Sequence, residues 1–202
     1  MSNATLITLV GPTAAGKTTL ARALQQAGLG RIATTTTRAP RPDEVLGRDL
    51  HVVSEQRFNQ LRSANALIAT CNYSRASYGT QVRHLRAAAA TALPQVIVVE
   101  PSGLTPLRSW AEEAGMGFRA VFVTSPVHLV WERLDGRYAQ NPQDLTELED
   151  RRRRADQETM QWRQLYAWDW VAENGSTEHE VEAILDLATR PAEPHHTLAL
   201  SV

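Results

Sequence analysis

The chain has one cysteine, one lysine and no long apolar run. A single cysteine, Cys71, excludes an internal disulfide and is typical of proteins from a reducing cytoplasm. No apolar stretch approaches the roughly 18 residues that cross a bilayer, and the N-terminus lacks the basic and apolar regions of a secretory signal. We therefore expect a cytoplasmic protein with no membrane partner.

The sequence also has no excess of charge of one sign. Its 202 residues carry 21 basic and 22 acidic side chains, for a net charge of −1. The overall charge thus gives no reason to expect a nucleic-acid partner. The length suits one domain, or one domain with a small insertion. The oligomeric state stays open between monomer and homodimer.

The single lysine lies within a phosphate-binding motif. All other basic residues are arginine, yet Lys17 occupies the lysine position of the spacing Gly-x-x-x-x-Gly-Lys-Thr. This spacing is typical of a P-loop, in which backbone N–H groups and a compact ammonium bind phosphate. The residues of the motif are Gly11, Pro12, Thr13, Ala14, Ala15, Gly16, Lys17, Thr18 and Thr19.

The surroundings of the motif support this interpretation. Thr5 to Val10 has the pattern of a buried strand that leads into the loop, and Thr18 to Gln26 has the pattern of a helix that leaves it. A P-loop requires this order of strand, loop and helix. A glycine turn without function is the alternative, and the context favours a nucleotide-phosphate site.

Strand and helix patterns alternate along the chain, which predicts an α/β fold with a mostly parallel sheet covered by helices. Further core strands are expected at 31–35, 95–99, 118–123 and 169–172, and helices at 81–92, 126–134, 144–167 and 178–189. In between, short strands at 50–53 and 67–71 surround a helix at 55–63, with a turn at 74–77. We therefore predict a core of residues 1–35 and 81–190, an α+β insertion at 36–80 and a loose tail at 191–202.

A second phosphate signal follows the predicted second strand. Arg38 and Arg41 lie three residues apart in the segment Arg38-Ala39-Pro40-Arg41-Pro42, directly after four threonines. Prolines keep such a segment stiff and extended, so the two guanidinium groups can converge on one anion with little loss of entropy. A solvated loop is the alternative. The position shortly after a P-loop favours a site for the phosphate of an acceptor.

The order of these motifs resembles guanylate kinase. The matching segments are Gly11 to Thr18, Thr36 to Asp49, Val53-Ser54, Tyr78-Gly79-Thr80 and Arg133 to Arg137. The most specific of them is Thr36 to Asp49. The resemblance covers roughly residues 5–188 and implies a P-loop NTPase-type α/β fold. In that fold the insertion holds a nucleoside monophosphate, and a mobile lid, here at about 136–150, closes over it.

The resemblance also implies phosphoryl transfer from ATP and a role for each matching residue. Residues 11–19 would bind ATP, Thr18 would hold Mg²⁺, and Lys17, Arg137 and Arg151 would be the catalytic cations. Arg38, Arg41 and Tyr78 would hold the acceptor phosphate, and Thr34 and Thr80 would face its base.

The chain departs from the family where the acceptor is recognised. Ala69 replaces a glutamate that reads the guanine edge, and Leu50 replaces a phosphate-binding tyrosine. An acidic Asp-x-Asp segment becomes Val98-Val99-Glu100, in which the longer Glu100 side chain can compensate by reaching the base. A lost buried hydrogen bond to a base typically costs about 1–3 kcal/mol. The sequence therefore predicts a working kinase and leaves its acceptor open among GMP, dGMP and related nucleotides.

Two other functions stay open. A sugar-phosphate kinase similar to ribose 1,5-bisphosphate phosphokinase also lacks the base-reading glutamate, but usually lacks the full Thr-Thr-Arg-x-Pro-Arg segment as well. A non-catalytic binding module typically loses the P-loop lysine and the lid arginines, which this chain keeps. Small-molecule nucleotides, with ATP and Mg²⁺ as cofactors, are therefore the expected partners.

Overall fold

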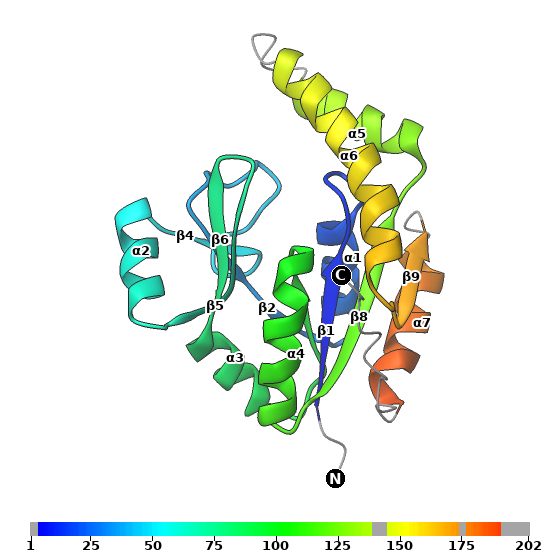
Figure 1. Ribbon diagram of the computed structural model, residues 1–202. Helices are drawn as coiled ribbons and strands as arrows, with labels where there is room; N and C mark the ends of the chain where they lie inside the picture. The colour runs from blue at the N-terminus through cyan, green and yellow to red at the C-terminus, as the bar shows by residue number, and fades with distance from the viewer. Residues whose placement is uncertain (1–3, 139–144, 174–176, 191–202) are drawn as a thin grey trace.

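The structure is a computed structural model that describes residues 4–138, 145–173 and 177–190 (Figure 1). The predicted tail at 191–202 and residues 139–144 of the predicted lid lie outside the described residues. Within them, the chain forms a parallel core sheet with helices on both faces, a second smaller sheet, and a pair of helices beside the P-loop.

The core sheet has five parallel strands in the order β2-β7-β1-β8-β9. Their bounds are Thr5–Val10 for β1, Gly30–Ile32 for β2, Gln95–Val98 for β7, Gly117–Thr124 for β8 and Trp170–Glu173 for β9. All six residues of β1 are buried, because helices cover both faces of this central strand. The predicted parallel sheet is thus confirmed.

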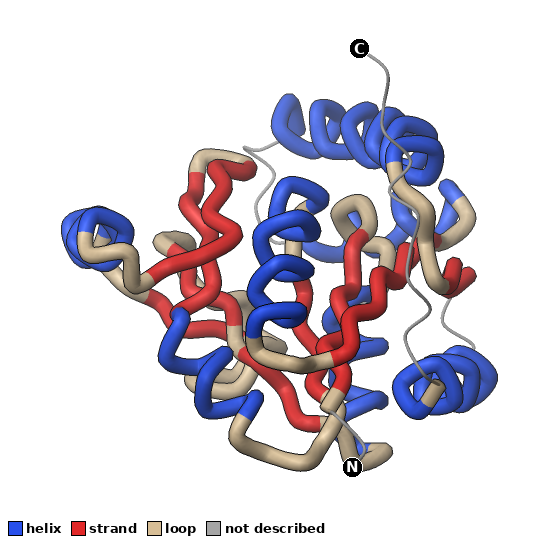
Figure 2. The backbone as a smooth tube through the Cα atoms, turned by 60° about the horizontal axis from the view of Figure 1, so that its bottom comes forward, coloured by secondary structure: helices blue, strands red, loops and turns tan. Residues whose placement is uncertain are grey.

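Helices pack on each face of the core sheet (Figure 2). On one face lie α1 (Lys17–Gln26) and α7 (Thr177–Thr189), against Ile7 and Leu9 of β1. On the other face lie α3 (Val82–Ala89) and α4 (Leu104–Glu113), against Leu6 and Val10. Side chains of β1 thus pack alternately into two apolar clusters, one on each face of the sheet. This packing fixes the end of β1, where the P-loop begins.

The second sheet has the order β4-β3-β6-β5 and lies beside the core. It contains β3 (Thr34–Thr36), β4 (Leu50–Val52), β5 (Leu67–Tyr73) and β6 (Ala76–Gln81), with α2 (Glu55–Ser63) packed through Phe58. The prediction of one strand over 31–35 was wrong: β2 and β3 belong to different sheets, and the chain passes between them at Ala33. The insertion therefore begins with β3, ahead of the predicted residue 36.

Two elements escaped the sequence prediction. Strand β6 was expected to be a turn followed by the start of a helix, since its residues show no alternation of polarity; its pairing with both β3 and β5 makes it a strand. Helix α4 was missed because it follows Pro101 and Gly103 and contains Pro106. A proline in the first helical turn removes only an N–H group that has no partner within the helix.

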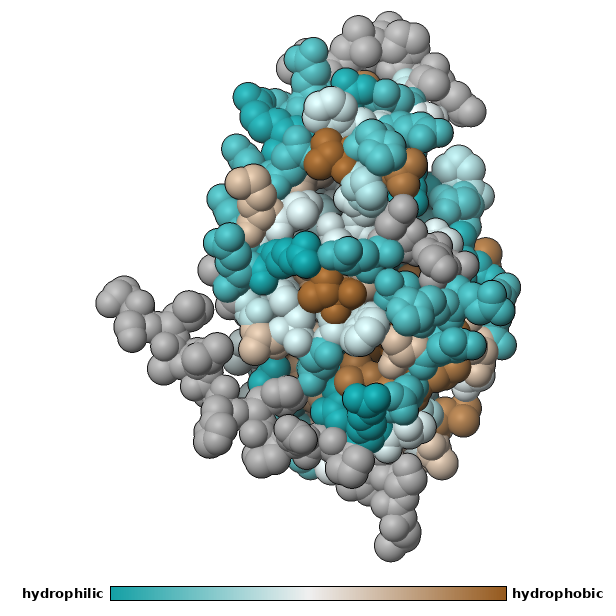
Figure 3. Space-filling model, turned by 90° about the vertical axis from the view of Figure 1, so that its right-hand side faces the viewer, coloured by the Kyte–Doolittle hydropathy of each residue, from teal (hydrophilic) through white to brown (hydrophobic). Residues whose placement is uncertain are grey.

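Helices α5 (Val127–Tyr138) and α6 (Leu145–Leu165) extend from the core beside the P-loop. Val130, Leu134, Leu148 and Ala155 pack against Ala14 of the P-loop in a small apolar cluster. Of the predicted lid at 136–150, residues 136–138 thus form the end of α5 and residues 145–150 the beginning of α6. No helix among the described residues is long and apolar enough to span a membrane. On the face shown in Figure 3, hydrophobic residues are scattered among hydrophilic ones.

Candidate functional site

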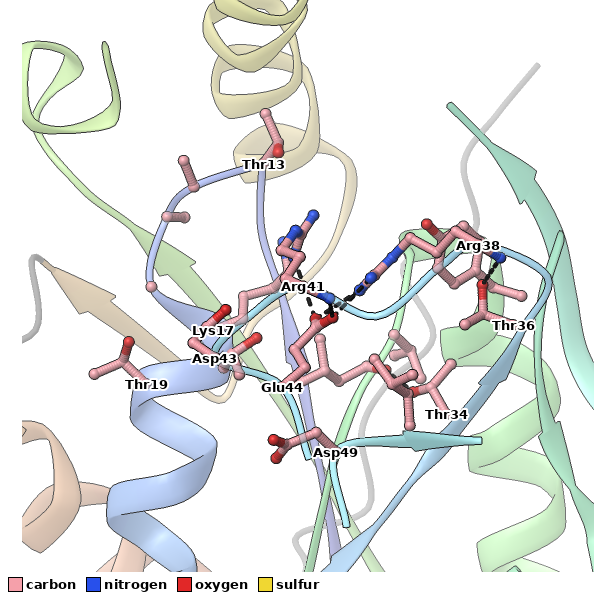
Figure 4. A pocket seen from close by; sticks show the side chains of 18 of the residues that line it. Thr13, Lys17, Thr19, Thr34, Thr36, Arg38, Arg41, Asp43, Glu44 and Asp49 are labelled. Atoms are coloured by element: carbon pink, nitrogen blue, oxygen red, sulfur yellow. Dashed lines mark hydrogen bonds and ion pairs between the residues drawn. The ribbon is translucent and has the colours of Figure 1, made fainter. Parts of the chain in front are cut away.

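A cavity lies between the P-loop, the second sheet and the end of α5. It brings together thirteen of the residues predicted to bind nucleotide. These are Thr13, Ala14, Ala15, Gly16, Lys17, Thr18, Thr19, Thr34, Arg38, Arg41, Tyr78, Glu100 and Arg137. The P-loop and the segment from Arg38 to Glu44, which we call the acceptor loop, thus form two walls of one space (Figure 4).

The P-loop joins β1 to α1 in a strained, compact turn. Ala14 and Gly16 have φ values of 60° and 99°, and a Cβ on Gly11 would lie 2.0 Å from the carbonyl oxygen of Val123. The Lys17 ammonium donates to the carbonyl oxygens of Gly11 and, at 2.8 Å, Pro12. Gly11 and Pro12 do not line the cavity. Gly11 allows the close approach to Val123, and the carbonyl oxygens of both residues orient the Lys17 ammonium.

The charge on Lys17 is poorly compensated. Burial lowers the pKa of its ammonium, while the carboxylates of Glu100 and Glu158 act in the opposite direction. Gly16 precedes helix α1 and provides no side-chain cap for its first N–H groups. A half-buried cation at the N-terminus of a helix is an arrangement that favours a phosphate group.

Glu44 holds the two arginines of the acceptor loop, as Figure 4 shows. Arg38 donates to both Glu44 oxygens at 2.7 and 2.6 Å, and the Arg41 side chain lies 3.4 Å from Oε1. Burial lowers the pKa of Arg38, but the hydrogen bonds and charge of Glu44 outweigh this and raise it overall. Burial and the charge of Arg38 lower the pKa of Arg41. Arg41 is therefore the less compensated of the two.

The opposite end of the cavity is largely apolar. Leu50, Val98 and Val99 line it, and Thr34 donates its hydroxyl to the Val98 carbonyl at 3.0 Å. Glu100 follows Val99 in this lining, and one of its carboxylate oxygens is buried without a hydrogen-bond partner. Burial raises the pKa of Glu100, while Lys17 opposes the change.

Besides Gly11 and Pro12, two further predicted site residues do not line the cavity. Thr80 is only 1% exposed, because β6 lies between β3 and β5, so we do not assign it to the base. Arg151 lies on α6 with its guanidinium carbon 5.9 Å from the centre of the Tyr138 ring. Its charge contributes to the lowered pKa values of Arg41 and Arg137, which line the cavity.

Arg137, at the end of α5, does line the cavity. Burial, followed by the charge of Arg41, lowers the pKa of Arg137 to about 10. The P-loop, the acceptor loop and α5 thus each bring at least one incompletely compensated cation to the same space. Such a set of cations can stabilise the charge of several phosphate groups placed end to end.

Several lining residues were not predicted: Arg31, Asp43, Glu44, Asp49 and Tyr73. Glu44 and Asp49 lie within the segment that resembles the family, so its acidic residues were an available signal. Arg31 and Tyr73 carried no comparable signal. The two reach the cavity because β2 and β5 end beside it, and this depends on how the two sheets pack.

The family model for guanylate kinase matches residues 3–189. The chain belongs to the guanylate kinase family. It is 36% identical over 136 residues to the guanylate kinase of Mycobacterium leprae, an alignment that covers 65% of this chain and 61% of that protein. It is 30% identical over 179 residues to the guanylate kinase of Methylobacillus flagellatus, with 88% of this chain and 84% of that protein covered.

The alignments differ in how much of the relatives they include. The chain spans about three fifths of the length of the mycobacterial relatives that it matches. The crystal structure of guanylate kinase from Anaplasma phagocytophilum superposes with a TM-score of 0.66 at 20% identity, over 93% of this chain and 85% of that one. This similarity confirms the fold of the family, including the P-loop NTPase-type α/β core.

The cavity has groups that fit a nucleotide-bound magnesium ion. Among the described residues, no three His, Cys, Asp or Glu side chains form a metal site by themselves. Mg²⁺ commonly keeps several waters and takes one or two protein groups together with phosphate oxygens. The Thr18 hydroxyl, which follows Lys17 and lines the cavity, is a group of this kind.

Proposed function

We propose that this chain transfers the γ-phosphoryl group of Mg-ATP to the phosphate of a nucleoside monophosphate, with GMP and dGMP as the first candidates. The observation that supports this most is the composition of the cavity. The P-loop lysine forms one wall, and two arginines held by a shared glutamate form the other. Membership of the guanylate kinase family supports the same reaction class.

In this reaction an acceptor phosphate oxygen bonds to the γ-phosphorus as the bond to the β,γ-bridging oxygen breaks, giving ADP and the acceptor diphosphate. The acceptor is already an anion, so no general base is required. Lys17 would meet the charge that builds up on the β- and γ-phosphates, and Arg137 and Arg151 would meet it from the lid side. Mg²⁺, held by Thr18 and the phosphates, would supply further charge neutralisation.

Arg38 and Arg41 would bind the acceptor phosphate with Tyr78. Glu44 holds both arginines before any acceptor arrives, at N–O distances of 2.6 to 3.4 Å. Arginines that are already oriented lose little side-chain entropy on binding an anion. Arg41, whose charge is the less compensated, offers the stronger attraction for that anion.

Base recognition would rest on few polar groups. Val98 and Val99 provide apolar surface for a base, Thr34 is already bonded to the Val98 carbonyl, and Glu100 offers an unpartnered carboxylate oxygen. A carboxylate is the natural partner of the N–H donors on the guanine edge. We therefore propose GMP or dGMP, read by Glu100, ahead of nucleotides that present acceptors at this edge.

The test is ADP production by the purified chain with Mg-ATP and a panel of acceptors. The panel contains the ribo- and deoxyribonucleoside monophosphates and ribose 1,5-bisphosphate. We expect fastest turnover with GMP or dGMP, and a loss of at least about a hundredfold in Lys17→Met. Glu100→Gln should lower kcat/KM for GMP by about tenfold or more and leave the KM for ATP unchanged.

Other outcomes of the panel point elsewhere. Preference for another nucleotide would keep the reaction and reject guanine recognition by Glu100. Preference for ribose 1,5-bisphosphate would favour a sugar-phosphate kinase. Tight ATP binding with no turnover of any acceptor would contradict the proposed activity and favour a binding module.

A further inference from the structure

Arg31 lines the cavity although it belongs to none of the motifs described above. It lies at the centre of β2, the edge strand of the core sheet next to β7. Its side chain is only 5% exposed. A buried arginine normally has a fixed partner that compensates its charge, so the identity and sufficiency of that partner decide what Arg31 does.

The partner of Arg31 is Asp49, which it shares with two other arginines. Arg31 Nη1 lies 2.8 Å from Asp49 Oδ1, while Arg22 and Arg48 lie 3.0 and 3.1 Å from Oδ2. The Val45 N–H also donates to Oδ2 at 2.8 Å. Hydrogen bonds from these groups, first among them Arg48, hold the pKa of Asp49 well below its usual range despite burial.

One carboxylate therefore faces three guanidinium groups, and the surplus of positive charge falls on Arg31. Arg22 has Asp43 as a second partner, and Arg48 is 42% exposed to water. Arg31 has neither, and its buried Nη1 makes no hydrogen bond of acceptable geometry. Burial lowers the pKa of Arg31, and the charges of Arg22 and Arg48 add to this, while the charges of Asp49 and Glu44 oppose it without reversing it.

Other cations that line the cavity are also incompletely compensated by nearby carboxylates. Burial likewise lowers the pKa values of Lys17, Arg41 and Arg137, and these are the residues to which the proposed function assigns phosphate groups. Arg31 shares their place in the wall and their incomplete compensation, and its side chain is more buried, at 5% exposed against 35% for Arg41. Beside it, Leu50 follows Asp49 in the wall and offers no side-chain donor.

We propose that Arg31 is a third arginine for the acceptor's phosphate monoester, which it binds from the Asp49 side of the cavity. This inference rests on the proposed function. The bound phosphate supplies the counter-charge that Asp49 alone does not provide, and Asp49 orients the guanidinium toward it. Arg31 thus supplements Arg38 and Arg41 on a wall where Leu50 has no donor.

A purely structural role makes a different prediction. If Arg31 only neutralises Asp49, replacing it should resemble the replacement of Arg48, another partner of the same carboxylate that does not line the cavity. In either variant Asp49 would keep two of its three arginines, Arg22 among them, and the hydrogen bond from the Val45 N–H. Both variants are therefore expected to fold, and Arg48→Met is the matched control.

The experiment compares Arg31→Met, Arg31→Lys and Arg48→Met by steady-state kinetics, using the acceptor that the wild-type chain turns over fastest. We expect Arg31→Met to raise the acceptor KM by about ten- to a hundredfold, the range for losing a charge-assisted hydrogen bond to phosphate. The KM for ATP should stay within about twofold, and Arg48→Met should stay close to wild type. Equal acceptor KM values for Arg31→Met and Arg48→Met would overturn the proposal.

Arg31→Lys decides the question should Arg31→Met be too unstable to assay. Lysine keeps a charge for Asp49 but lacks the guanidinium fork, so a several-fold rise in acceptor KM supports phosphate binding and an unchanged KM rejects it. Should the wild-type chain turn over no acceptor, the proposed function fails separately. Calorimetric titration with GMP then tests Arg31 by itself: a dissociation constant unchanged by Arg31→Met would reject the proposal.

Discussion

The pH dependence of stability at Glu158 tests the charge interactions near this cavity, because Glu158 interacts with Glu100 and Lys17. It lies on α6, is 7% exposed, and accepts a hydrogen bond from the Tyr73 hydroxyl at 3.3 Å. Burial, followed by the charge of Glu100, raises the pKa of Glu158 to about 7, while Lys17 and Arg154 oppose this. The folded chain therefore keeps a proton that the unfolded chain releases at lower pH.

The sign of the effect follows from this raised pKa. The contribution of Glu158 to stability is complete below pH 4.5, its ordinary pKa, and is lost as the pH rises to about 7. Each pKa unit corresponds to about 1.4 kcal/mol, which sets a ceiling of about 3 kcal/mol for the loss. Relaxation and water entry reduce that ceiling, so we expect Glu158→Gln to be about 1–2 kcal/mol more stable than wild type at pH 8.

The assay is urea unfolding at pH 5 and pH 8, followed by tryptophan fluorescence. Glutamine keeps an acceptor for the Tyr73 hydroxyl, so the variant isolates the charge. Glu149→Gln, an exposed glutamate of the same helix, is the matched control and should leave the difference between the two pH values unchanged. A Glu158→Gln variant with the same pH dependence as wild type would refute the reasoning.

Three further predictions concern the loop, the lid and the cysteine. Gly11→Ala should lower the free energy of unfolding by about 3 kcal/mol or more in urea titrations, because its Cβ would lie 2.0 Å from the Val123 carbonyl oxygen; a loss under 1 kcal/mol would contradict this. Arg137→Met should lower kcat by about a hundredfold or more at a nearly unchanged acceptor KM; a change in KM alone would make it a binding residue. Burial, with Glu100, raises the pKa of Cys71 to about 11, so iodoacetamide should label it at pH 8 about a hundred times more slowly than in urea; equal rates by mass spectrometry would show an accessible thiolate.

Local chemistry explains what the sequence predicted well. Helix α2 has the predicted bounds, Glu55–Ser63, because the Ser54 hydroxyl caps it by accepting from the Arg57 N–H at 3.1 Å. The P-loop is recognisable because its backbone turn needs glycine at fixed positions, and Gly16 has a φ of 99°. Signals of this kind extend over only a few residues, so they are readable without knowledge of the fold.

Elements that depend on distant partners were less predictable. Strand β6 exists because β3 and β5 pair with it on either side, and its own residues carry no strand pattern. Thr80 was expected at the base, yet the same pairing buries it inside the second sheet. From the sequence, Thr34 and Thr80 had the same predicted role. The packing of the strands leaves Thr34 in the cavity lining and buries Thr80.

The sequence by itself determined the phosphate chemistry of this protein: a P-loop with its one lysine, and two arginines stiffened by prolines. These features act through neighbours along the chain. Only the tertiary structure decided which further charges act in the cavity, since Arg31 and Glu44 line it and the charge of Glu158 on α6 acts on Lys17. The physical reason is that burial and charge compensation depend on contacts between residues far apart in the chain, such as Arg31 with Asp49 and Tyr73 with Glu158.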